Sequence, residues 1–281
     1  MAFLPLRSVP VPPDFEAEVT AWLDSIDQAL DDPDTDRNEL CRSILTDLHY
    51  PGVQDADLDA LPAPTRLAIR QLDPRNVTLE PEYYSEIDVE AYARVKPLIW
   101  LWEGFDRSAL GENVHVGIRF RRLLAKRIFR RCGRNFKAFH QVKLSFGYNL
   151  EVGDNVVVHR EVLLDDRGGI RIEDGASVSD FVNIYSHSHD IVDGREVFTP
   201  TTVIGAGARI TYHATILAGT TVAPDSMVGA GSMLTRSTEP HTVWVGVPAR
   251  QIKTKDLEKR KSAPPRRPDP LADPEPGDST P

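Results

Sequence analysis

Two histidines lie two residues apart in the segment Ser186-His-Ser-His-Asp190. A neutral imidazole titrates near physiological pH, so either His187 or His189 can act as a general base and take the proton of a substrate hydroxyl. Imidazole also binds zinc, and His159 and His213 are further candidate ligands. A lone histidine is more often a surface or structural residue. The elements that carry the pair therefore decide whether it performs chemistry.

A period of six residues runs through the centre of the chain. Thirteen aliphatic or aromatic residues follow it, with a two-residue shift beside Gly168 and Gly169. They are Phe146, Val152, Val158, Leu164, Ile172, Val178, Ile184, Ile204, Ile210, Ile216, Val222, Val228 and Leu234. Helices repeat near 3.6 residues and half-buried strands repeat at two. A period of six is typical of a coil of short parallel strands, each with one inward side chain.

The period stops once, between Ile184 and Ile204, and the irregular segment there contains both histidines. A departure from a repetitive coil often carries function, because the coil itself serves as a scaffold. We therefore expect the catalytic base in this segment, with His189 and His187 as the candidates and contact with the substrate as the other role open to His187.

The remainder of the chain differs from the coil. Amphipathic spacing and prolines predict a mostly helical region over 1–135, with helices near 14–30, 40–48, 86–103 and 119–131. Residues 136–254 form the predicted coil domain. Residues 255–281 contain hardly any apolar side chains, which predicts a disordered tail.

Charge is sorted along the chain. Residues 14–90 hold 20 acidic and 5 basic residues, whereas 119–137 hold 9 basic residues and no acidic one. The basic helix predicted over 119–131 can pack on the coil and pair with the acidic region, which we favour. Peripheral contact with an anionic membrane and binding of a polyanion are the alternatives.

Composition narrows the function classes. The 281 residues are 41% apolar and 27% charged, which indicates a globular protein. The net charge of −9 argues against nucleic-acid binding by the whole chain. Two widely separated cysteines, with no export signal or membrane span in the sequence, predict a cytoplasmic location, with the inner face of the membrane as an alternative.

Several stretches together resemble the hexapeptide-repeat acyltransferases, closest to the maltose and galactoside O-acetyltransferases. They are FGYNLEVGDNVVV, IRIEDGASVSDFVNIYSHSHD, VIGAGARI, APDSMVGAGSMLTRS and VWVGVPARQIK, within about 140–254. The resemblance implies a left-handed parallel β-helix that assembles as a homotrimer, with active sites in the clefts between neighbouring subunits. It also implies acetyl-CoA or another acyl-CoA as co-substrate, with no metal expected.

The resemblance assigns residues to the acyl donor. His189 matches the catalytic histidine, and the backbone N–H of Tyr212 matches the donor to the oxyanion. Coenzyme A is then expected to contact Ala230, Thr235 and Arg236. Its phosphates are expected to meet two basic side chains near the end of the coil, Arg250 and Lys253.

The acceptor side departs from these relatives. His159 stands where they have an asparagine, and Arg167 stands where they have an aspartate, so the acceptor is expected to differ from the relatives' sugar. Asp166 is a candidate hydroxyl-binding acid. We expect an O-acyltransferase that acts on a sugar or glycoconjugate. The alternatives are a carbonic-anhydrase-like metal enzyme and a non-catalytic trimeric scaffold.

Overall fold

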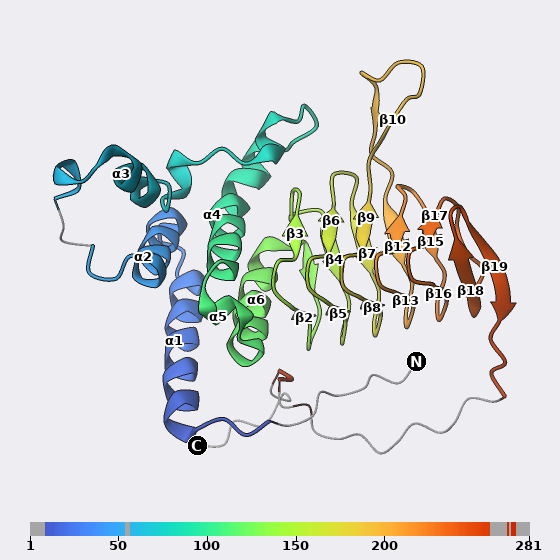
Figure 1. Cartoon of the computed structure of the whole chain (residues 1–281), viewed down its shortest axis with the longest axis horizontal. Helices are drawn as coiled ribbons and strands as arrows, with labels where there is room; N and C mark the ends of the chain where they lie inside the picture. Colours follow the sequence, from blue (N-terminus) through green and yellow to red (C-terminus); the bar gives the residue numbers. More distant parts are fainter. Residues whose placement is uncertain (1–8, 54–56, 259–268, 270, 274–281) are drawn as a thin grey trace.

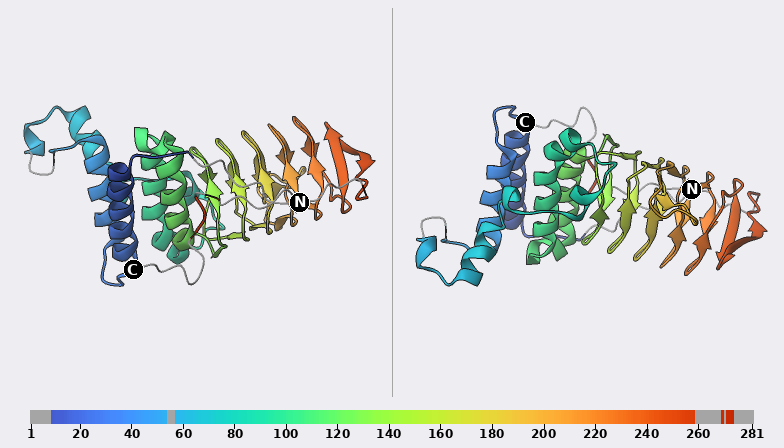
Figure 2. Two further views of the ribbon diagram at one scale, coloured as in Figure 1. Left: turned by 90° about the horizontal axis from the view of Figure 1, so that it is seen from below. Right: turned by 90° about the horizontal axis from the view of Figure 1, so that it is seen from above.

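The computed structural model describes residues 9–53, 57–258, 269 and 271–273. A helical region stands at one end and a long coil of short strands extends away from it (Figure 1). Two further views show the coil as a stack of successive turns along one axis (Figure 2). The predicted order of helical region and parallel β-solenoid is confirmed.

Six α-helices precede the coil among the described residues. They are α1 (Pro13–Asp31), α2 (Arg37–His49), α3 (Ala63–Arg70), α4 (Val89–Asp106), α5 (Ala109–Glu112) and α6 (Val114–Ile128). Three short 3₁₀ helices lie between α2 and α4, namely η1 (Leu58–Ala60), η2 (Pro74–Asn76) and η3 (Glu80–Tyr83). The four predicted helices are found as α1, α2, α4 and α6, although α6 begins five residues earlier than expected because Asn113 caps its N-terminus.

The coil consists of three parallel sheets, here called A, B and C. Sheet A contains β1 (Arg131–Cys132), β4 (Leu150–Val152), β7 (Ile170–Ile172), β12 (Thr202–Ile204) and β15 (Thr221–Val222). Sheet B contains β2 (Lys137–Ala138), β5 (Val157–Val158), β8 (Ser177–Val178), β13 (Arg209–Ile210), β16 (Met227–Val228), β18 (Thr242–Gly246) and β19 (Ala249–Thr254). Sheet C contains β3 (Lys143–Leu144), β6 (Leu163–Asp165), β9 (Asn183–Tyr185), β14 (Thr215–Ile216) and β17 (Met233–Leu234).

The six-residue period produces the core of the coil. All thirteen residues of the period are at most 1% exposed. Their stacking gives the parallel pairs, for example Ile184 beside Ile216 and Ile172 beside Ile204. One large apolar side chain per strand thus fills the interior, which explains why strands of two or three residues remain ordered.

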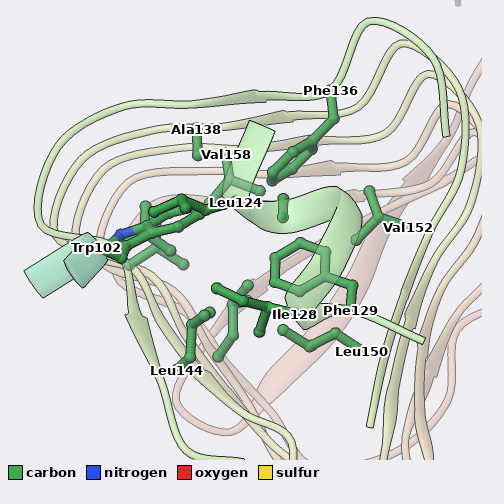
Figure 3. Close-up of a cluster of buried hydrophobic side chains, with 14 of the residues drawn as sticks. Trp102, Leu124, Ile128, Phe129, Phe136, Ala138, Leu144, Leu150, Val152 and Val158 are labelled. Atoms are coloured by element: carbon green, nitrogen blue, oxygen red, sulfur yellow. The ribbon is translucent and has the colours of Figure 1, made fainter. Parts of the chain in front are cut away.

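The helices close one end of this interior. Apolar side chains of α4 and α6, including Trp102, Leu124 and Ile128, meet those of the first turns of the coil, such as Phe136 and Leu150 (Figure 3). At the other end, β19 pairs antiparallel with β18. The helices therefore cover one end of the stack, and β19 covers the edge of β18 in sheet B at the other end.

The basic helix α6 also supplies polar contacts to the coil. Arg121 and Arg122 are buried, and they donate hydrogen bonds to the carbonyl oxygens of Ala138 at 3.2 Å and Phe136 at 2.7 Å. Arg121 also forms a buried ion pair with Asp106. These arginines satisfy carbonyl groups of the first turn that have no preceding strand to bond.

The opposite side of α6 pairs with acidic α1. Arg119 lies 2.9 Å from the carboxylate of Glu16, and Arg127 lies 2.7 Å from that of Asp27. The favoured arrangement of the basic helix, packed on the coil and paired with the acidic region, is thus the one observed. Among the described residues, no helix is long and apolar enough to span a membrane.

Most of the predicted disordered tail, namely 259–268, 270 and 274–281, lies outside the described residues. Three described residues of that segment contact the junction of α6 and the coil. Asp269 pairs with Lys137 at 2.7 Å, Asp273 pairs with Arg122 at 3.2 Å, and Leu271 is buried.

Candidate active site

The segment 186–201 joins β9 to β12 and projects from the coil as a small hairpin (Figure 1). Its strands, β10 (Ser188–His189) and β11 (Val197–Phe198), pair antiparallel. Asp190 accepts the backbone N–H groups of Val192 at 2.8 Å and Asp193 at 2.7 Å. Asp190 therefore stabilises the turn of the hairpin.

His189 lies at the base of this hairpin. Its Nδ1 atom lies 3.1 Å from the carbonyl oxygen of Gly194, and only a protonated Nδ1 can donate to that acceptor. In the neutral ring, Nε2 is then unprotonated and can accept a proton. The side chain is exposed, as a base that meets an external substrate requires.

His187 lies beside His189, with ring centroids 5.6 Å apart and the rings nearly perpendicular. Its Nδ1 atom contacts the Oδ2 atom of Asp165, whose side chain is only 5% exposed. A buried carboxylate facing one ring nitrogen fixes the orientation of the imidazole, as in other carboxylate–histidine pairs.

Asp165 was not among the residues predicted from the sequence. Asp165 and Tyr185 are register partners on β6 and β9, so Asp165 lies one turn of the coil away from the start of the hairpin. The stacking of successive turns was the available signal, because it places the residue after Leu164 close to the residues after Ile184.

Both histidines line a pocket of about 550 Å³. One side of the pocket comes from the coil and includes Ser145, Leu163, Asp165, Arg167 and Tyr185. The other side comes from η3 and the residues after it, which are Glu80, Tyr83, Tyr84, Ser85 and Glu86. The helical region thus contributes one side of the pocket, a role that the sequence did not reveal.

Arg167 connects the two sides of the pocket. Its side chain is 6% exposed and forms an ion pair with Glu86. Its guanidinium carbon lies 3.9 Å from the ring centroid of Tyr84, within the range of a cation–π contact. Arg167 therefore anchors the segment after η3 against the coil.

Asp166 was predicted to bind the acceptor, but the structure places it elsewhere. It is fully buried, does not line the pocket, and accepts the backbone N–H groups of Phe146 at 2.7 Å and Asn149 at 3.1 Å. Burial raises the pKa of Asp166 to about 6, and the backbone hydrogen bonds oppose that shift. Asp166 holds a turn of the coil, and its neighbour Asp165 faces the pocket instead.

His159 lies on a different edge of the coil from the pocket. It follows β5, where the chain passes from sheet B to sheet C, whereas His187 and His189 follow β9, where the chain passes from sheet C to sheet A. Its ring stacks on Phe139 at 4.8 Å, and burial lowers its pKa. Within one chain, His159 and the pocket therefore lie on different edges of the coil.

The residues predicted to bind coenzyme A also divide between these edges. Tyr212 and Ala230 lie between sheets B and C, whereas Thr235 and Arg236 follow β17 of sheet C. Arg250 and Lys253 lie on β19. All six residues are exposed. One chain alone does not bring them together.

The alternative function, a carbonic-anhydrase-like enzyme, requires a bound metal ion. Within the described part of the chain, no three histidine, cysteine, aspartate or glutamate residues are grouped so as to hold a metal ion. His213 stacks on Phe181 at 4.7 Å, on the same edge as His159. The four histidines therefore fall into two pairs on separate edges.

Comparisons with known proteins agree with this architecture. Galactoside O-acetyltransferase of Escherichia coli (strain K12) is 28% identical over 137 residues, which cover 47% of this chain and 68% of that protein. The structure of a maltose O-acetyltransferase from Clostridium difficile 630 superposes with a TM-score of 0.54 at 25% identity, covering 62% of this chain and 92% of the other. No protein-family model matches the sequence.

A second solved structure is a galactoside acetyltransferase in complex with coenzyme A. It superposes with a TM-score of 0.54 at 25% identity and covers 61% of this chain and 86% of the other. These similarities confirm the predicted resemblance to the hexapeptide-repeat acyltransferases. The chain is similar to an O-acetyltransferase over about half of its length, and one similar solved structure contains coenzyme A.

Proposed function

We propose that this protein transfers an acyl group, most simply acetyl, from acyl-CoA to a hydroxyl of a sugar or glycoconjugate, with His189 as the general base. The observation that carries the proposal is an exposed histidine with one nitrogen bonded to a backbone carbonyl, at the edge of a pocket of about 550 Å³. The similarity to acetyltransferases, one of them bound to coenzyme A, supports the choice of donor.

In the proposed reaction, Nε2 of His189 takes the proton of the acceptor hydroxyl as the oxygen attacks the thioester carbonyl. The carbon–sulfur bond then breaks, and the imidazolium returns the proton to the sulfur, so that coenzyme A leaves as a thiol. The backbone N–H of Tyr212 is the proposed donor to the oxyanion. The contact with Asp165 holds His187 beside the reacting hydroxyl.

We also propose that the active protein is a homotrimer. The proposed donor residues occupy two separate edges of the coil, with Tyr212 and Ala230 on one and Thr235 and Arg236 on the other. A closed ring of three copies places the first edge of one copy against the second edge of the next, which assembles three equivalent sites. Arg250 and Lys253 then bind phosphates of coenzyme A. The cytoplasmic location stays a prediction.

The proposal is tested by following release of coenzyme A from acetyl-CoA with a panel of sugars. His189→Ala is expected to lower kcat by about 10² to 10⁴-fold, the usual contribution of a general base. His187→Ala tests the alternative base. Arg195→Ala is the matched control, because Arg195 lies on the same hairpin and is 91% exposed.

Unchanged turnover in His189→Ala would refute the assignment of the base. Light scattering measures the oligomer in parallel. A monomer that retains full activity would refute the proposed trimeric site.

A further inference from the structure

The pocket beside the histidines carries three carboxylates and one guanidinium. The carboxylates belong to Glu80, Glu86 and Asp165, and the guanidinium belongs to Arg167. Arg167 is buried, and its charge is already paired with Glu86 and stacked on Tyr84. An anionic group that enters this pocket would therefore meet three carboxylates and only one guanidinium, and Arg167 would have to leave Glu86 to bind it.

The segment Glu80–Glu86, called here the N-terminal wall, is fixed at its C-terminal end. Arg167 holds Tyr84 and Glu86 against the coil. Just beyond the segment, the backbone N–H of Asp88 donates to the hydroxyl oxygen of Tyr148 at 2.9 Å. The wall is thus positioned before any acceptor binds, as selectivity in a pocket requires.

The N-terminal wall presents aromatic surface to the pocket. Tyr83 is 76% exposed, a large exposure for an aromatic side chain. Tyr84 bonds to the carboxylate of Glu80, and this hydrogen bond, followed by burial, raises the pKa of Tyr84 to about 12, so the phenol stays neutral. Tyrosine rings offer apolar faces for the C–H face of a sugar and attract cations.

We propose that the N-terminal wall selects the acceptor, and that the acceptor is a glycoside that is uncharged or positively charged and bears no phosphate, sulfate or carboxylate. This inference rests on the proposed acyltransferase function and names the class of its second substrate. Carboxylates bind neutral hydroxyls or an ammonium group and repel anions, and the tyrosine rings add apolar surface that carries no charge.

The test uses glucosides that differ only at the anomeric group, with the four remaining hydroxyls free in each. The groups are 2-aminoethyl, methyl and phosphate, which carry positive, zero and negative charge. The matching galactosides and N-acetylglucosaminides extend the series. We expect kcat/KM to follow the order aminoethyl, then methyl, then phosphate, with at least about a tenfold loss at the last step that shrinks as salt is added.

Two variants examine the wall itself. Glu80→Gln removes one carboxylate. It is expected to reduce the ratio of kcat/KM for methyl glucoside to kcat/KM for glucose 1-phosphate severalfold. Glu90→Gln is the matched control, because Glu90 is exposed on α4 and does not line the pocket. Tyr83→Ala is expected to raise KM for all three glucosides while kcat stays near its original value.

Binding of the same glycosides to the His189→Ala protein, followed by calorimetry, separates this inference from the reaction. If the glycosides bind in the expected order but the original protein shows no turnover, the proposed acyltransferase activity is refuted and the assignment of the pocket stands. Turnover or binding of glucose 1-phosphate as good as that of methyl glucoside would overturn the inference. The inference would also be overturned if none of the glycosides bound, or if Glu80→Gln left the ratio of kcat/KM between methyl glucoside and glucose 1-phosphate unaltered.

Discussion

The buried carboxyl of Asp166 is expected to make the stability of the folded protein depend on pH. The carboxyl is fully buried, and its pKa rises from 3.8 to about 6 in the folded protein. A raised pKa means that the folded state binds the proton more tightly than the unfolded chain does. At 1.36 kcal/mol for each unit, the protonated group stabilises the fold by about 3 kcal/mol at low pH, and this contribution is lost as the pH rises through 6.

Asp166→Asn removes this titration. The amide oxygen can still accept one backbone N–H, but the NH₂ group cannot accept the other, which costs about 1–3 kcal/mol at every pH. The stability of the original protein relative to Asp166→Asn is therefore expected to fall by about 2 kcal/mol between pH 4.5 and pH 7.5. Because all other groups are common to both proteins, their titration cancels in the difference.

Urea unfolding at several pH values, at one protein concentration, measures the difference. Asp174→Asn is the matched control, since Asp174 is exposed and accepts the backbone N–H of Asp154 at 2.8 Å. A difference between Asp166→Asn and the original protein that stays constant with pH would refute the reasoning. If Asp166→Asn changed the KM for the acceptor and left the pH dependence of stability unchanged, Asp166 would instead be a substrate-binding residue.

Three further changes test other parts of the molecule. Asp165→Asn is expected to lower kcat/KM by about tenfold without lowering the unfolding midpoint, because His187 loses its carboxylate partner; unaltered kinetics would contradict this role. Asp106→Asn leaves the buried Arg121 without its ion pair and is expected to cost about 3–5 kcal/mol in urea unfolding, so a cost below 1 kcal/mol would contradict it. Ile210→Ala is expected to cost about 2–5 kcal/mol by leaving a cavity in the coil, and a well-packed, equally stable variant would show that the core can collapse.

The sequence was informative about the coil for a simple physical reason. Each turn repeats the same demand for one large inward side chain, so the period of six is visible without knowledge of any neighbour. The break of the period likewise identified the hairpin with His187 and His189. Helix α1 was predicted because its buried residues recur at helical spacing along a local segment.

The pocket could be predicted only in part. Asp166 and Asp165 are adjacent aspartates, and local sequence does not say which one turns into the interior and which faces the pocket. The contacts of Arg167 with Tyr84 and Glu86 join residues about 80 positions apart, and no period connects them. The sequence therefore predicted the histidines and pointed to Arg167 on the acceptor side, but it did not predict Asp165 or the segment Glu80–Glu86 beside them.

By itself, the sequence determined the solenoid, its interruption and the pair of histidines, because these depend on hydrophobic burial within a repeating local pattern. Only the tertiary structure decided that Asp165 faces His187, that Asp166 is buried, and that Glu80–Glu86 forms one side of the pocket. Those outcomes depend on how the helical region packs across the coil, where contacts between distant segments set the burial and the partner of each charged group.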